Sequence, residues 1–165
     1  MSKRIVVDAD VFAAASLVSE RGKKCALVLT TILEVCHRVA VSDDLMTEWQ
    51  AHRSAFSNKW LNQMFGRKKV ERVQRTSMEP LRDQINALSE PCRSVGTKDA
   101  HLVEAAISTD GVVVSCDETA RACLAKVGDP RFSGVSWLNP DVHEDAATWL
   151  EGGAIPEARL LLTRP

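Results

Sequence analysis

Arg4-Ile5-Val6-Val7-Asp8-Ala9-Asp10 is a short run of β-branched apolar residues that ends at two acids. Apolar runs of this length, with no polar residue alternating in them, are typical of strands buried on both faces of a parallel sheet. The residues that follow, 11–18, are good helix formers, and the first breaker is Gly22. The beginning of the chain therefore predicts a buried strand that leads directly into a helix.

The same alternation continues along the chain. Further strands are predicted at 39–41, 112–114 and 135–138. Helices are predicted at 11–18 and 23–38, after a capping Ser42, across 58–90 with interruptions at Gly66 and Pro80, after a capping Thr97, and from about Asp117. Strands separated by helices predict an α/β fold, a three-layer α/β/α sandwich with a central parallel sheet.

Length and composition favour one compact domain. The chain has 165 residues, of which 45% are hydrophobic and 26% charged, which is typical of a soluble globular protein. The alternating pattern occupies 1–140, so we expect that segment to be the domain. Residues 141–165 are expected to be an extension that packs on this domain or on a partner.

The sequence also bears on the compartment. No apolar stretch approaches the roughly 20 residues that cross a bilayer, and the apolar run at 5–7 is too short for a secretory signal. We therefore expect a cytoplasmic protein that does not enter a membrane. The five cysteines form no C-x-x-C pair and their number is odd, so reduced thiols are expected.

Four acids in the sequence fall at corresponding places in the predicted fold. Asp8 ends the first strand and Asp117 follows the strand at 112–114, while Glu48 and Asp99 lie near the starts of predicted helices. Parallel sheets place their active sites beyond the carboxyl ends of the strands, so Asp8 and Asp117 would face one crevice if their strands are neighbours. Each acid also has an ordinary structural explanation, such as an ion pair between Asp117 and Arg121 or a favourable interaction of Asp99 with a helix dipole.

Taken together, the four carboxylates favour a metal site. Two carboxylates about 4 Å apart repel by about 4 kcal/mol at an effective dielectric constant of 20. A divalent cation removes that conflict, and carboxylate oxygens without His or Cys are the ligands of Mg²⁺ or Mn²⁺. These ions bind phosphate oxygens and activate water, so the chemistry favoured is hydrolysis of phosphodiesters.

The ordered set of these residues resembles the motifs of PIN-domain ribonucleases. The segments that carry the resemblance are Ile5-Val6-Val7-Asp8-Ala9-Asp10, Ser42 with Glu48, Lys98-Asp99-Ala100-His101, and Val112-Val113-Val114-Ser115-Cys116-Asp117. The resemblance spans roughly 4–140 and implies a metal-dependent endoribonuclease. It implies that Asp8, Glu48, Asp99 and Asp117 hold Mg²⁺ or Mn²⁺, and that Ser115 steadies a ligand or a water, with Ser42 and Asp10 in support.

The resemblance also implies partners. RNA would be the substrate, and many small PIN proteins are toxins of toxin–antitoxin pairs, so an antitoxin-like protein inhibitor and a homodimer are expected alternatives to a lone monomer. Two positions depart from the family pattern. Asp10 stands where an Asn, Ser or Thr is usual, and Cys116 stands where Asn is frequent, so the family role of that Asn is not carried by Cys116.

A basic segment is the candidate RNA-binding surface. The formal net charge is only −1, but between His52 and Arg82 eight Lys and Arg stand against two Glu. Basic runs of this kind bind phosphate or form an exposed helix face, and both interpretations remain open. The candidates to guide an RNA backbone are Arg67, Lys68, Lys69, Arg72 and Arg75.

Two other functions compete with the ribonuclease. Asp8-Ala9-Asp10-Val11 also resembles the D-x-D-x-V opening of haloacid-dehalogenase-type phosphatases, in which Asp8 would be the nucleophile and Asp10 the general acid. That resemblance would give Ser42 and Lys98 phosphate-binding roles, and it accounts less well for Glu48 and Asp99. The third interpretation is a catalytically silent domain that binds RNA or protein, because a fold does not guarantee chemistry.

Overall fold

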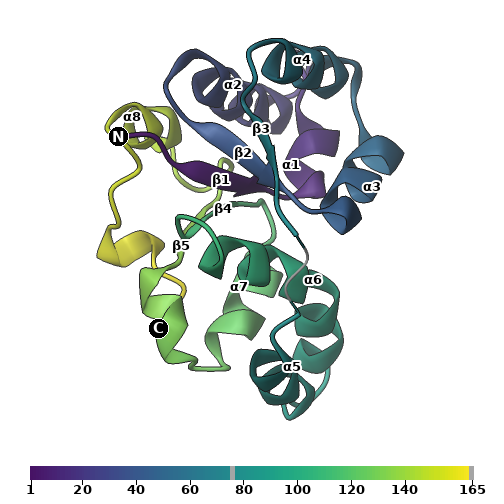
Figure 1. Cartoon of the computed structure of the whole chain (residues 1–165), viewed down its shortest axis with the longest axis vertical. Helices are drawn as coiled ribbons and strands as arrows, with labels where there is room; N and C mark the ends of the chain where they lie inside the picture. The colour runs from purple at the N-terminus through teal and green to yellow at the C-terminus, as the bar shows by residue number, and fades with distance from the viewer. Residues whose placement is uncertain (75–76, 164–165) are drawn as a thin grey trace.

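The computed structural model describes residues 1–74 and 77–163, and within them the chain forms five strands and eight α-helices (Figure 1). The strands are β1 (Arg4–Val7), β2 (Arg38–Val41), β3 (Val70–Arg72), β4 (Val112–Val114) and β5 (Ser136–Leu138). The α-helices are α1 (Ala9–Ala14), α2 (Glu20–Glu34), α3 (Asp43–His52), α4 (Ala55–Gly66), α5 (Glu79–Asn86), α6 (Cys92–Ile107), α7 (Glu118–Ala125) and α8 (Ala146–Glu151). Two short 3-10 helices, η1 (Pro130–Gly134) and η2 (Ala158–Leu160), precede β5 and the C-terminus.

All five strands are parallel and form one sheet in the order β3-β2-β1-β4-β5. The predicted α/β class and its central parallel sheet are confirmed. β1 lies in the middle, with Ile5 opposite Val39 of β2 and Val6 opposite Val113 of β4. The chain moves outward through β2 and β3 on one side of β1, then returns to build β4 and β5 on the other side. The boundary between β1 and β4 is therefore the switch point at which such sheets bind ligands.

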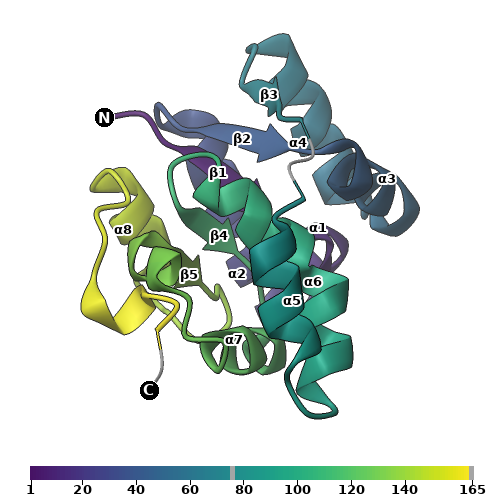
Figure 2. The same cartoon turned by 60° about the horizontal axis from the view of Figure 1, so that its bottom comes forward.

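Helices cover both faces of the sheet (Figure 2). On one face α6 packs on β1 and β4, with α5 and α7 against it, and on the other α2 packs near β2, with α4 and α8 against it. The strands β1, β2 and β4 are almost wholly buried between these helix layers. Trp49 joins α3 to the end of the central strand, because its indole Nε1 donates to the Val7 carbonyl at 2.9 Å.

One glycine, in the turn between α6 and β4, is required by the close approach of the backbone at the end of η1. Gly111 has a positive φ of 72°, and a Cβ at this position would lie 2.2 Å from the Gly134 carbonyl oxygen. Its own carbonyl accepts from Ser136 N at 2.7 Å. The turn that delivers the chain into β4, and hence to Asp117, depends on this residue because no side chain fits there.

The C-terminal segment packs on the same chain. Leu150, Leu160 and Leu162 are fully buried in the hydrophobic core that the sheet and helices share. Leu162 N donates to the Val135 carbonyl at 2.8 Å, which attaches this segment beside β5. These three leucines are thus part of the core that supports the sheet.

Three predicted local features are wrong. The stretch 58–90 was expected to be helical, yet Val70–Arg72 is an edge strand, β3, between α4 and α5. The sequence of β3, Val-Glu-Arg, is too short and too polar to show a strand pattern. The segment is defined as a strand by its pairing with β2. Thr97 is not a helix cap, because α6 begins at Cys92, directly after Pro91. The helices predicted at 11–18 and 23–38 also begin and end earlier, as α1 and α2.

The expectation of reduced thiols is wrong for one pair. Cys92, at the start of α6, forms a disulfide with Cys123 of α7, and these two helices pack side by side. The cysteines are 31 residues apart in sequence, so their pairing depends on which helices become neighbours in the fold. Cys25, Cys36 and Cys116 are free thiols.

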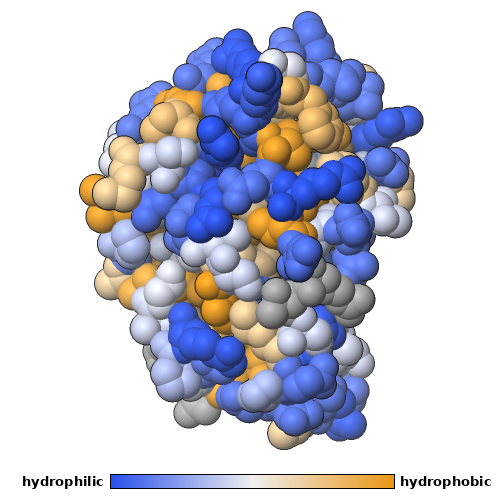
Figure 3. Space-filling view, viewed as in Figure 1, coloured by the Kyte–Doolittle hydropathy of each residue, from blue (hydrophilic) through white to orange (hydrophobic). Residues whose placement is uncertain are grey.

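Within the described ranges, none of the helices combines the length and apolar character needed to cross a membrane. The face seen in Figure 3 is largely hydrophilic, with hydrophobic residues in small separate areas. Figure 3 thus shows charged and polar side chains over most of the ungreyed part of this face.

Candidate active site

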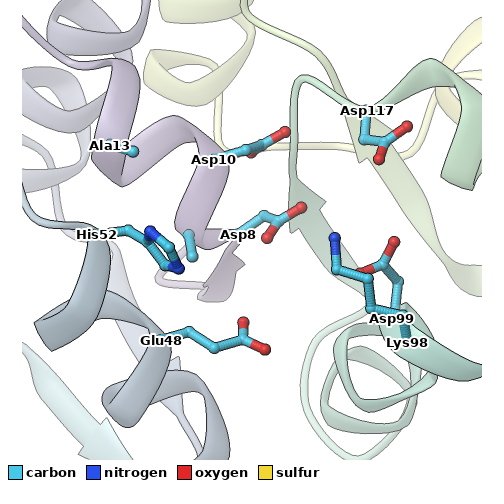
Figure 4. Close-up of a pocket in the computed structure, with 9 residues that line it drawn as sticks. Asp8, Asp10, Ala13, Glu48, His52, Lys98, Asp99 and Asp117 are labelled. Atoms are coloured by element: carbon cyan, nitrogen blue, oxygen red, sulfur yellow. The ribbon is translucent and has the colours of Figure 1, made fainter. Parts of the chain in front are cut away.

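A cavity of about 270 Å³ opens at the carboxyl ends of β1 and β4, where the sheet topology predicts a ligand site. All four predicted catalytic acids line it, and they come from four places in the sequence (Figure 4). Asp8 follows β1, Glu48 lies on α3, Asp99 lies on α6, and Asp117 precedes α7. The full lining is Asp8, Ala9, Asp10, Ala13, Glu48, His52, Lys98, Asp99 and Asp117.

Ser115 connects the two acids at the switch point. Its hydroxyl, which is fully buried, donates to Asp8 Oδ2 at 2.8 Å and accepts from Asp117 N at 3.1 Å. Asp117 in turn caps α7, since its Oδ1 accepts from Ala120 N at 2.8 Å. The hydroxyl thus fixes Asp8 to the loop that carries Asp117, in agreement with a supporting position for Ser115.

Asp10 also points to this loop from the first turn of α1. Its Oδ2 accepts from Cys116 N at 3.1 Å, and Ser115 Oγ lies 3.5 Å away. Its other oxygen, Oδ1, is buried and has no hydrogen-bond partner among the described residues. Such an orphan oxygen is costly unless a ligand or a proton satisfies it.

Burial makes these carboxylates weaker acids than usual. Burial raises the pKa of Asp10 to about 7, and the neighbouring Asp8 charge adds to the shift. Burial likewise raises the pKa of Asp99 to about 6, helped by repulsion from Asp8 and Asp117. The pKa of Asp8 is also raised by burial, against the opposing hydrogen bond from Ser115. The shifts record both the burial of these side chains and, for Asp10 and Asp99, the proximity of like charges.

Glu48 stands on the opposite wall, on α3, and faces His101 of α6. Its Oε2 lies 3.4 Å from His101 Nε2, and His101 Nδ1 lies 3.0 Å from the Lys98 carbonyl in α6. Because a carbonyl only accepts, Nδ1 carries the hydrogen. His101 Nε2 is buried and has no hydrogen-bond partner among the described residues. Lys98, beside Asp99, and His52, one turn beyond Glu48, add basic groups to the rim (Figure 4).

Ser42 lies outside the cavity. Its side chain caps α3 by accepting from Leu45 N at 3.3 Å, and it lines a small neighbouring cavity with His101 and Glu104. Its hydroxyl therefore stabilises the helix that carries Glu48, and a direct contact with substrate, as the phosphatase interpretation requires, is not favoured.

The basic segment does not gather around the acids. Arg67, Lys68 and Lys69 precede β3, so they lie at the amino ends of the parallel strands, at the edge opposite the cavity. Lys69 Nζ donates to the Ile32, Leu33 and Val35 carbonyls, and Arg67 Nη1 donates to the Leu33 carbonyl at 3.2 Å.

Both side chains therefore cap the C-terminus of α2, where four carbonyls lack helical partners. Arg72, at the other end of β3, pairs with Asp43 at 3.0 Å. Arg75 lies outside the described residues. Arg67 and Lys69 thus have structural roles at the far edge of the sheet, and RNA binding by the basic segment stays a prediction.

Asn139 is a supporting residue that the sequence interpretation missed. It is 1% exposed and follows β5, and its Nδ2 donates to the Cys116 carbonyl at 3.3 Å and to Glu118 Oε1 at 2.9 Å. An amide thus does hold the loop between β4 and α7, although it comes from the next strand. The available signal was its place at the end of the last predicted strand, the same signal that marked Asp8.

The donor set fits Mg²⁺ or Mn²⁺ in its chemistry. It offers carboxylate oxygens from separate elements, including the orphan Asp10 Oδ1, without a thiol on the cavity wall. In the conformation described for 1–74 and 77–163, no three His, Cys, Asp or Glu side chains surround one point closely enough to hold an ion. Side-chain rotation would be needed to draw the carboxylates together.

Comparison with known proteins adds no family assignment. The chain matches no protein-family model, and no curated protein has a significantly similar sequence.

Proposed function

We propose that this protein is a divalent-metal-dependent endoribonuclease of the PIN type. One observation carries the proposal: four acids chosen from separate sequence motifs line a single cavity at the switch point of a parallel sheet. The buried Ser115, which joins Asp8 to the Asp117 loop, supports the same assignment. A solvated surface acid needs no such network, so the arrangement favours a functional role over chance.

The residues divide into holding and positioning roles. Asp8, Asp99 and Asp117 would hold Mg²⁺ or Mn²⁺, with Glu48 on the facing wall to accept a proton from the attacking water. When bound, the ion lowers the pKa of water and neutralises charge on the phosphodiester. Ser115 orients Asp8, and His101 Nε2 lies 3.4 Å from Glu48 Oε2.

Binding of the substrate would use the rim. Lys98 is exposed beside Asp99, and His52 lies next to Glu48, so both can donate to phosphate oxygens that enter the cavity. RNA is therefore expected to cross the carboxyl edge of the sheet. In this proposal a protein inhibitor, as in a toxin–antitoxin pair, would act by covering that edge.

A phosphatase is the second candidate, and one observation favours it. Burial raises the pKa of Asp10 to about 7, which would let this carboxyl donate a proton two residues after a nucleophilic Asp8. The engaged hydroxyl of Ser42 and the position of Glu48 on the cavity wall favour the nuclease instead.

One experiment separates the candidates. The purified protein is incubated with mixed single-stranded and structured RNA and, separately, with p-nitrophenyl phosphate, each with Mn²⁺, Mg²⁺ or EDTA. Internal cleavage of RNA that requires metal supports the nuclease, and release of p-nitrophenol supports the phosphatase. Binding of RNA without either product would support the silent binding domain and overturn the enzyme.

A further inference from the structure

Two free thiols lie in contact beside the candidate active site. The Sγ atoms of Cys25 and Cys116 are 3.6 Å apart, although the residues are separated by 91 positions in sequence. Cys25 is fully buried on α2, whereas Cys116 is half-buried in the loop after β4. This pair is distinct from the Cys92–Cys123 disulfide, which joins α6 to α7. The third free thiol, Cys36, is exposed and contacts the Met1 carbonyl.

Cys116 is built into the network that positions the acids. It stands between Ser115, which donates to Asp8, and Asp117, and its own N–H donates to Asp10 Oδ2 at 3.1 Å. Its carbonyl accepts from the Asn139 amide. A displacement of this one residue therefore reaches the three carboxylates Asp8, Asp10 and Asp117.

We propose that Cys25 and Cys116 are a redox modification site, and that their disulfide switches the cavity off. The effect on catalysis rests on the proposed function, whereas formation of the disulfide does not. Hydrogen peroxide is the oxidant considered, and it meets Cys116 first because Cys25 is fully buried.

The reaction balances in two steps. The Cys116 sulfur attacks one peroxide oxygen, the O–O bond breaks, and the products are a sulfenic acid and water. The Cys25 sulfur then attacks the Cys116 sulfur, the S–O bond breaks, and a second water leaves as the disulfide forms. The two thiols lose two electrons and two protons in total, and the peroxide is reduced to two waters.

The distance that the two sulfur atoms must move predicts how much activity the oxidised protein loses. A disulfide bond is about 2.05 Å long, so the sulfurs must approach by roughly 1.5 Å from their present contact. Catalytic groups tolerate displacements of about 0.5 Å, and a 1 Å misplacement can cost about a hundredfold in rate. We therefore expect the oxidised protein to lose at least about tenfold in RNA cleavage.

Formation of the bond is tested by peptide mapping. The protein, with metal removed by EDTA, is treated with peroxide, quenched with catalase, alkylated and digested with trypsin. Trypsin releases Cys25 in the peptide 25–38 and Cys116 in 99–121, so the new disulfide links these two peptides. Because 25–38 also contains Cys36, the mapping is repeated in Cys36→Ser. The link between 83–93 and 122–126 reports the Cys92–Cys123 disulfide in the same digest.

The expected result is a link between 25–38 and 99–121 in both the natural chain and Cys36→Ser. Oxidation of Cys36 or Cys116 without this link overturns the proposal. The mapping does not depend on activity, so it decides the modification even if the protein cleaves no RNA.

The switch is tested by activity in matched variants. The natural chain should lose at least about tenfold after peroxide and recover with dithiothreitol, whereas Cys25→Ala, in which Cys116 can form the sulfenic acid but not this disulfide, should lose less. Dithiothreitol also reaches Cys92–Cys123, and Cys25→Ala controls for that effect. Equal loss in Cys25→Ala, or full activity of the linked protein, would overturn the control of the cavity by this disulfide.

Discussion

At the scale of single residues, two acids of the cavity, Asp8 and Asp99, lie in surroundings that disfavour their charged forms. Asp8 and Asp99 are 8% and 5% exposed, and burial raises the pKa of both. A charge removed from water and set beside like charges destabilises the fold. Carboxylates that are costly to the fold but chemically useful are typical of functional sites, where stability and activity are traded against each other.

Substitution of Asp8 by Asn tests the central acid. The change keeps the size of the side chain but removes the charge, so metal-stimulated RNA cleavage should fall by at least about a hundredfold. Circular dichroism should show an unchanged fold, and Mn²⁺ should no longer raise the melting temperature. Asp141→Asn, the same change at a half-exposed acid outside the cavity, is the control. Normal cleavage by Asp8→Asn would remove Asp8 from the site.

The buried Asp99 predicts a pH dependence of stability. Its pKa is about 6 in the folded protein against an ordinary 3.8, so between these values the folded state holds a proton that the unfolded state has released. The contribution of Asp99 therefore falls as pH rises from about 4 to 7 and stays low above that. A shift of about two pKa units corresponds to at most about 3 kcal/mol.

This dependence is measured as a difference between two proteins. Burial lowers the pKa of His37, which makes stability rise with pH in an overlapping range, so the natural chain alone is ambiguous. In EDTA, the melting temperature of Asp99→Asn minus that of the natural chain should increase from pH 4 to pH 7 by several degrees. A flat or decreasing difference would contradict the burial of a charged Asp99.

At the scale of elements, the strands that could be predicted from the sequence are those whose own residues are continuously apolar. The strands β1, β2 and β4 are apolar runs buried on both faces, so composition alone defined them. The edge strand β3 carries Glu71 and Arg72, and its identity comes from pairing with β2. Asp8 and Asp117 could be chosen because they follow strands β1 and β4, whereas Glu48 and Asp99 lie inside α3 and α6. The contacts of Asn139 and His101 form only between elements.

Lys69 was expected to guide an RNA backbone, but in the structure its charge lies at the C-terminus of α2. Its ammonium donates to three carbonyls at the C-terminus of α2, and burial lowers its pKa. Lys69→Met should leave these carbonyls without their donor and reduce the free energy of unfolding by about 1–3 kcal/mol. Lys68→Met, at an exposed neighbour, should change it by less than about 0.5 kcal/mol. Denaturant unfolding measures both, and equal stability of the two variants would refute the capping role.

At the scale of the whole molecule, the site is a consequence of topology. The acids are up to 109 positions apart between Asp8 and Asp117, and they meet because β1 and β4 are parallel neighbours at the centre of the sheet. The same topology separates charges: Lys98 lies on the rim of the cavity, whereas Lys68 lies before β3, at the opposite edge. Charge along the sequence therefore gives no guide to which lysines lie beside the cavity.

This separation predicts how salt affects RNA binding. Each phosphate contact with single-stranded RNA contributes about −0.7 to the slope of log K against log salt concentration. Lys98→Gln should make the slope shallower by roughly that amount, because Lys98 would lose its contact with the backbone. Lys68→Gln removes the same charge from the opposite edge and should leave the slope unchanged. Fluorescence anisotropy with labelled RNA in EDTA, where no cleavage occurs in this proposal, gives both slopes. If Lys68→Gln changes the slope and Lys98→Gln does not, the RNA crosses the other edge of the sheet and the cavity is not where it binds.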